Sequence, residues 1–295
     1  MNIARETLVA ALLSCTVVST ALGQTDVMQA QIDALWEQAS ESSQGVQVGS
    51  ATVVAEDGWL LLGEDACAFS RLVNADEICI YSAILFPREG ISIDSVYYAA
   101  PEDLGHVNMD EWTDDVNSQI DELWEGYVEG AKAQSERIGF DVIPLKWVQY
   151  PTLSKTSKVM SYGILIDFGG DKIINLAVVK FTRTGYVVME LVTSDEMLAT
   201  NSLTFDDVSV YASDTYLPAD GSRYADFKVG DKVAAIGAVG VLASVMGVTQ
   251  KKGTWAAIGA AVLLFAKKLW FLLLLIPAAI WGAVKKLTGR GDPSA

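Results

Sequence analysis

The sequence predicts an α+β fold, in which an exported domain packs an antiparallel β-sheet with helices and is followed by a C-terminal hydrophobic helical membrane anchor. Three observations predict it. Runs of β-rich residues divided by turn residues fill two blocks of the chain, 46–99 and 141–193. A long amphipathic helical pattern lies between the blocks. An almost continuous apolar run occupies Val233 to Val284.

The first 23 residues have the layout of a secretory signal peptide. Arg5 precedes the apolar run Leu8 to Val18, and small residues end the segment at Gly23. We therefore expect residues 1–23 to be removed on export, with an uncleaved N-terminal anchor as the alternative. Residues 24–45 are predicted to form an N-terminal helix and a polar linker, because their apolar residues first repeat at helical spacing and then stop.

Residues 46–230 are predicted to form the exported α+β domain. Short connections such as Gly169–Asp171 indicate hairpins and therefore an antiparallel sheet. Short helices are expected at Ser194–Thr200 and Phe205–Tyr211. The expected strands are Val46–Val54, Trp59–Leu62, Ile78–Phe86, Ile91–Ala99, Asp141–Gln149, Lys158–Asp167, Ile173–Thr182 and Tyr186–Thr193.

The long helix between the two blocks has one apolar stripe and an acidic opposite face. Asn108 is a suitable N-cap with Glu111 three residues later, and Gly139 supplies the end. This spacing predicts that the stripe packs on the sheet. Its members are Trp112, Val116, Ile120, Leu123, Trp124, Tyr127 and Ala131.

Residues 231–295 are predicted to form a transmembrane anchor and basic tail. Val233 to Val248 holds no charge, and as a helix the run through Gln250 would be about 27 Å long, near the roughly 30 Å of bilayer hydrocarbon. The lysine pairs beyond it follow the positive-inside rule if the acidic domain lies outside. One crossing followed by interfacial helices and two crossings both fit the short apolar segments that follow.

Four small residues are predicted to form a packing face on the first membrane helix. Gly237, Gly240, Ser244 and Gly247 recur at spacings of three and four residues, which lets helices approach closely. We expect self-association through this stripe or packing against the following helix. The alternative explanation is that glycine is simply common in membrane helices.

Composition restricts the classes of function. The chain has 37 acidic and 21 basic residues and a formal net charge of −16, which argues against a nucleic-acid partner. His106 is the single histidine, so a His-rich zinc site is excluded, and no catalytic residue, metal ligand or cofactor is assigned. Abundant acid pairs such as Asp114-Asp115 keep open an envelope hydrolase or a divalent-cation-dependent enzyme as the alternative function.

Two groups of residues remain as candidate sites. Cys67 and Cys79 would form a disulfide after export, with two free buried thiols as the alternative. Tyr97 and Tyr98 are neighbours in a predicted strand and point to opposite faces, so at least one is expected at the surface. Together with His106 in the following loop, they form the candidate partner-binding group.

The segment YADFKVGDKVAAIGAVGVLA, Tyr224 to Ala243, carries the clearest resemblance to a known family. Supporting features are the GSATVV strand from Gly49 to Val54 and the pair Trp147 and Pro151. The chain resembles the bacterial membrane-anchored proteins grouped as domain of unknown function 2167. The resemblance covers nearly the whole mature chain, although the loop Pro101–His106 departs from the family pattern. It implies an exported domain with a C-terminal anchor and no established activity.

These observations together predict a non-catalytic binding or scaffold protein of the bacterial envelope. The main domain is expected on the periplasmic side of the inner membrane, because an exported acidic module precedes an apolar segment and a basic tail. The expected partners are the lipid bilayer, a second copy of the chain and an unknown envelope protein.

Overall fold

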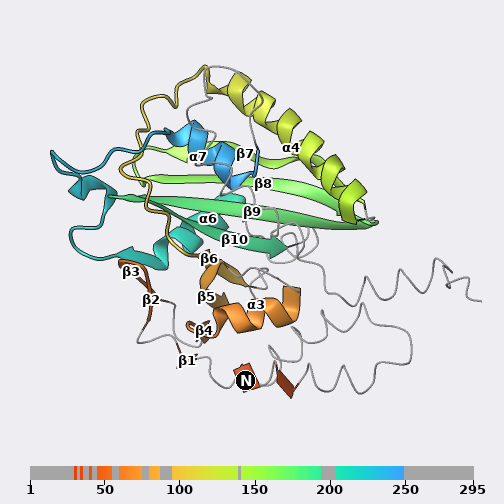
Figure 1. Ribbon diagram of the computed structural model, residues 1–295, viewed down its shortest axis with the longest axis horizontal. Coiled ribbons are helices and arrows are strands. Elements are labelled where there is room, and N and C mark those ends of the chain that lie inside the picture. The colour runs from red at the N-terminus through yellow and green to blue at the C-terminus, as the bar shows by residue number, and fades with distance from the viewer. Residues whose placement is uncertain are drawn as a thin grey trace, which may run out of the picture.

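The computed structural model describes residues 30–31, 34–35, 40–41, 45–54, 60–74, 80–86, 95–138, 141–193 and 204–248. These ranges form an α+β domain on an eight-stranded and a three-stranded antiparallel sheet, as the sequence predicts (Figure 1). The predicted signal peptide, the helix at 194–200 and the chain beyond 248 lie outside the described residues, so those predictions stay predictions.

The large sheet joins the two predicted blocks of strands. Strands β7 to β10 form a meander, and β6 pairs with β10 to attach the earlier block. Edge strand β7 shifts register at three places, and such irregularity hinders pairing with another chain. Across the sheet the order is β1 (Ser40–Glu41), β4 (Leu60–Leu62), β5 (Tyr81–Phe86), β6 (Val96–Ala99), β10 (Gly185–Thr193), β9 (Asp171–Thr182), β8 (Val159–Phe168) and β7 (Val142–Ser154).

The predicted strand Val46–Val54 is a hairpin in the structure. Strand β2 (Val46–Val48) turns back through Gly49 and Ser50 into β3 (Ala51–Val53), because Gly49 adopts a left-handed φ of 62°. Strand β3 also pairs with β11 (Tyr216–Pro218), which completes the three-stranded sheet.

Helices cover both faces of the large sheet. Helices α4 (Val116–Ile138) and α7 (Ala238–Val245) pack on one face in a shared core, and α3 (Ala66–Asn74) packs beside β5 on that face (Figure 1). The other face is covered by α6 (Phe205–Asp214) and the small sheet. Helix α6 confirms the helix predicted at Phe205–Tyr211.

Helix α4 contains the predicted apolar stripe from Val116 onward, but it begins at Val116 rather than after Asn108, so Trp112 lies outside the helix. Asn108 Oδ1 instead accepts a hydrogen bond from the Asp110 amide at 2.6 Å, which closes a local turn. Glu111 Oε1 accepts from the Val239 amide at 2.9 Å and so caps helix α7 instead of its own helix. Of the two side chains expected to start α4, that of Asn108 therefore closes a local turn and that of Glu111 caps a distant helix.

The structure corrects the prediction of a membrane crossing over Val233–Val248. Helix α7 has eight residues, about 12 Å of helix, and it packs against α4 in the domain core. It ends because Gly247, at φ 69°, forms a Schellman motif in which the Val248 amide donates to the Ala243 carbonyl at 3.0 Å. Among the described residues, no helix has the length and apolar character needed to cross a bilayer.

The predicted packing face of small residues is divided by these helix ends. Gly237 lies before α7 in an extended conformation and Gly247 lies after it, so Gly240 and Ser244 remain on the helix. A Cβ at Gly237 would lie 2.2 Å from the Glu111 carboxylate, which explains the glycine by the approach of the capping side chain. The four residues do not share one helical face.

Candidate functional site

The structure places Tyr97 and Tyr98 in the core rather than at the surface. Tyr97 is 6% exposed and lies 5.0 Å from the Tyr81 ring in the cluster beneath α3. Tyr98 has no exposed surface, and its hydroxyl bonds to that of Thr215 on the opposite face. The expectation of an exposed tyrosine is wrong because helices and a second sheet cover both faces of β6.

Cys67 lies on α3, where its sulfur is 3.1 Å from the Tyr81 carbonyl oxygen. The structure has Cys67 disulfide-bonded. Cys79 lies outside the described residues, so the pairing of Cys67 with Cys79 stays a prediction.

His106 is the remaining candidate residue. It packs against a loop that the sequence analysis did not assign to a site. We call residues 224–233 the signature loop, because they begin the segment that carries the family resemblance. The His106 ring lies between Tyr224 and Phe227, with both ring-centre distances at 4.1 Å. The site therefore combines one predicted residue with two aromatic residues that belong to the signature loop.

Backbone hydrogen bonds hold the signature loop to the chain at His106. The His106 amide donates to the Lys232 carbonyl at 2.8 Å, and the Ala234 amide donates to the His106 carbonyl at 2.9 Å. Gly105 adopts a φ of 99°, and a Cβ there would lie 2.8 Å from the Lys232 carbonyl oxygen. Close approach of two backbones therefore requires glycine at this position.

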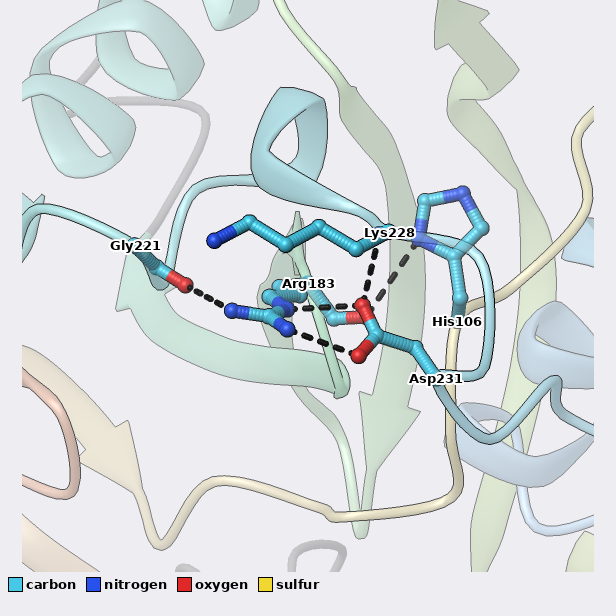
Figure 2. A network of polar contacts seen from close by, with 5 residues as sticks. All are labelled: His106, Arg183, Gly221, Lys228 and Asp231. Atoms are coloured by element: carbon cyan, nitrogen blue, oxygen red, sulfur yellow. Dashed lines mark hydrogen bonds and ion pairs between the residues drawn. The ribbon is translucent and has the colours of Figure 1, made fainter.

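A bidentate ion pair closes the signature loop (Figure 2). Arg183 follows β9, and its Nε and Nη2 donate to the two Asp231 carboxylate oxygens at 2.8 and 2.7 Å. Nη1 of the same guanidinium donates to the Gly221 carbonyl at 3.0 Å, and Asp231 also accepts from the Lys228 amide at 2.7 Å. Asp231 thus links the loop backbone to the sheet, and Arg183 hydrogen bonds lower its pKa to about 2.

Further contacts fix the beginning of the signature loop. The Tyr224 hydroxyl donates to the Val107 carbonyl at 2.7 Å, and Lys158 Nζ lies 5.1 Å from the centre of the Tyr224 ring. Asp226 ends the short helix η2 (Tyr224–Asp226) and accepts from the Arg223 amide at 2.9 Å. Both ends of the loop are therefore tied to the domain.

The middle of the signature loop exposes apolar side chains to solvent. Val229 is fully exposed, Val233 is 59% exposed and Phe227 is 38% exposed. Lys228 and Lys232 are exposed beside them. An apolar tip on a loop fixed at several points is suited to contact a partner surface.

The chemistry of His106 is that of a neutral, stacked ring. Burial is the largest influence on its pKa and lowers it below the ordinary value. Nδ1 lies 3.3 Å from the Arg183 carbonyl oxygen, and because a carbonyl only accepts, Nδ1 donates. In the neutral ring Nε2 then carries the acceptor lone pair. Within the described ranges, no group of three or more His, Cys, Asp or Glu is arranged to hold a metal ion.

Sequence reasoning found His106 but missed Arg183, Asp231 and the apolar tip. The available signal was the segment at Tyr224–Ala243, which was singled out as a family feature without a structural role. Arg183 and Asp231 are 48 residues apart in the chain, so spacing could not pair them.

Of three comparisons with known proteins, one identifies the family of this chain. A solution structure of the cyanobacterial PsbP protein from Synechocystis sp. PCC 6803 is similar to this chain with 9% sequence identity and a TM-score of 0.35, covering 58% of this chain and 87% of that one. No curated protein matches the sequence. The family model described as "Protein of unknown function (DUF2167)" matches residues 41–278. The chain therefore belongs to the DUF2167 family of proteins of unknown function.

Proposed function

We propose that this protein is a membrane-anchored binding or scaffold protein of the bacterial envelope, with its main domain on the periplasmic side of the inner membrane. The sequence supports the location through the apolar, lysine-punctuated segment beyond residue 250 and the signal-like start. One structural observation carries the binding role: Val229 is fully exposed on a loop that the Arg183–Asp231 ion pair fixes to the sheet.

The composition of the signature loop indicates the chemistry of its partner. Burying Val229, Val233 and the exposed part of Phe227 would remove apolar surface from water, which favours association. Lys228 and Lys232 lie beside that surface and would meet acidic groups at its rim. The partner that fits is an envelope protein with an apolar pocket and an acidic border.

Fixing the loop before binding reduces the entropy that association would otherwise lose. The side chains of Arg183 and Asp231 are only 24% and 19% exposed, so water competes weakly for their hydrogen bonds. The ion pair thus acts on binding through the shape of the loop.

Site-specific photo-crosslinking tests the binding role in cells that express the full-length chain. A photoreactive residue at Val229 should capture one discrete envelope protein, whereas the same residue at Val210, 57% exposed on α6, should not. Val229→Asp should prevent the interaction, and Val210→Asp serves as the matched control. Equal capture from both positions, or lipid adducts alone at Val229, would contradict the proposed protein partner.

Membrane fractionation tests the location separately. The full-length chain should remain in the membrane pellet after carbonate washing, because apolar burial in hydrocarbon resists release at high pH. A protease added to spheroplasts should digest the domain if it lies on the periplasmic side. Recovery of the chain in the soluble cytosolic fraction would contradict the proposed location.

A further inference from the structure

A second site lies away from the signature loop, in a cavity of about 40 Å³ between α4, α7 and the large sheet. This volume holds roughly three water-sized positions. The neighbouring positions of α4 and α7 above the sheet are visible in Figure 1. The cavity is lined by the half-buried glycines Gly126, Gly130 and Gly247 and by half-buried Asn175, and its other lining side chains are buried.

The strand register builds the floor of the cavity. Tyr162, Ala177 and Glu190 are direct partners on β8, β9 and β10, so their side chains lie in one row on the face beneath α4. Ala177 is the smallest of the three and leaves space between its larger neighbours. Burial raises the pKa of Tyr162 above its ordinary value, so its hydroxyl stays neutral near neutral pH.

Two amide side chains line this cavity with buried polar atoms that have no hydrogen-bond partner. Gln134 has no exposed surface, and neither its Nε2 nor its Oε1 is paired. Asn175 Oδ1 is likewise buried and unpaired. Leaving such groups without partners is unfavourable, so their placement on one cavity indicates a ligand that pairs with them.

The unpaired atoms define the chemistry of that ligand. They comprise two acceptors, Gln134 Oε1 and Asn175 Oδ1, and one donor, Gln134 Nε2. A carboxylate would supply acceptors only and would approach the Glu190 side chain, which is 4% exposed and lines the same cavity. An ammonium ion would supply donors only and leave Gln134 Nε2 unpaired. An amide or urea edge supplies both kinds of group.

We propose that this cavity binds a small neutral molecule with a carboxamide or urea edge, held by Gln134 and Asn175. The edge pairs with Gln134 through two parallel hydrogen bonds, in which a ligand N–H donates to Oε1 and Nε2 donates to a ligand carbonyl. A second ligand N–H donates to Asn175 Oδ1. This cavity is separate from the signature loop, so the proposal does not depend on the proposed function.

Titration of the full-length protein with acetamide tests this inference. With glutamine side chains labelled with nitrogen-15, acetamide should shift the Gln134 amide resonances with a dissociation constant on the order of 1 to 10 mM, as expected for so small a ligand. Acetate and methylammonium have similar size and should bind at least tenfold more weakly. Equal shifts from all three probes, or no shift from acetamide, would overturn the proposal and leave ordered water as the occupant.

Three variants separate the site from general effects. Gln134→Leu should weaken acetamide binding at least tenfold by removing the paired amide, and Ala177→Val should do so by filling the floor. Gln149→Leu makes the same change outside the cavity lining and should retain wild-type binding. Thermal melting of each variant shows whether it is folded, and binding by folded Gln134→Leu at wild-type strength would also overturn the proposal.

Discussion

The signature loop and the cavity beneath α4 use polar side chains in opposite ways. At the loop, the guanidinium of Arg183 from the end of β9 has hydrogen bonds to Asp231 and to the Gly221 carbonyl, and these polar groups fix the loop backbone. In the cavity, the Gln134 amide is buried with both polar atoms unpaired. Polar groups with partners thus fix a loop that presents apolar side chains, whereas the polar groups without partners are available to bind a ligand.

The largest effect that tests the loop side of this comparison is expected from Gly105→Ala. The substitution combines a left-handed φ of 99° with a Cβ 2.8 Å from the Lys232 carbonyl, so it should lower the free energy of unfolding by about 3 kcal/mol. Gly170→Ala is the matched control, since Gly170 has φ 105° and open space around its Cβ. It should lose only about 1 kcal/mol, the strain alone. Equal losses in urea unfolding would show that contact with the signature loop contributes little.

On the cavity side, Gln134→Leu should raise the free energy of unfolding, whereas Gly105→Ala lowers it. Leucine has a similar volume and removes two buried unpaired polar atoms, so the free energy of unfolding of the ligand-free protein should rise by about 1 kcal/mol. Arg183→Met replaces a polar group that has partners and should instead destabilise the protein. Urea unfolding of both variants measures the contrast, and destabilisation by Gln134→Leu would contradict the assigned difference between the regions.

A smaller, pH-dependent effect should distinguish the Arg183–Asp231 ion pair from an exposed one. The Asp231 pKa is lowered to about 2 from about 3.9 in an unfolded chain, so the pair stabilises the fold above the unfolded value and this contribution is lost as pH falls towards 2. Asp231→Asn should flatten the stability curve in that window. Asp220→Asn breaks a pair with Arg223 whose side chains are 94% and 63% exposed, and it should leave the curve near wild type. Indistinguishable curves for the two variants would contradict a structural role for Asp231.

How much of the structure could be predicted from the sequence depended on whether the signal was local or came from contacts between distant residues. Strands β7 to β10 and helix α6 were predicted because alternation, helical period and turn residues are local signals. The burial of helix α7 in the domain was not predicted, because an apolar run has the same composition in a membrane helix and in a protein core. Its burial depends on Asn108 and Glu111, which pair with its first turn from more than a hundred residues away.

The candidate sites depended on tertiary contacts even more strongly. Tyr97 and Tyr98 were assigned to opposite sheet faces correctly, but no local signal shows that both faces are covered. Gln134 lies on a predicted helix and Asn175 on a predicted strand, yet only the packing of α4 on the sheet brings both to one cavity. The signature loop could be recognised as a motif, but its shape could not be predicted because it depends on the contact of Asp231 with Arg183.

The smallest expected effect concerns His106, whose ring contacts two aromatic residues of the signature loop. Burial between Tyr224 and Phe227 lowers its pKa, and Lys158 acts in the same direction, whereas Asp231 and the bond to the Arg183 carbonyl oppose the shift. Because the unfolded chain binds the proton more readily, stability should be lost as pH falls from about 6.5 towards the folded pKa. His106→Phe keeps a flat ring in the stack and should remove this dependence. Since the sequence has one histidine, a single imidazole resonance reports the titration, and a midpoint at or above 6.5 would show that stacking does not exclude water from the ring.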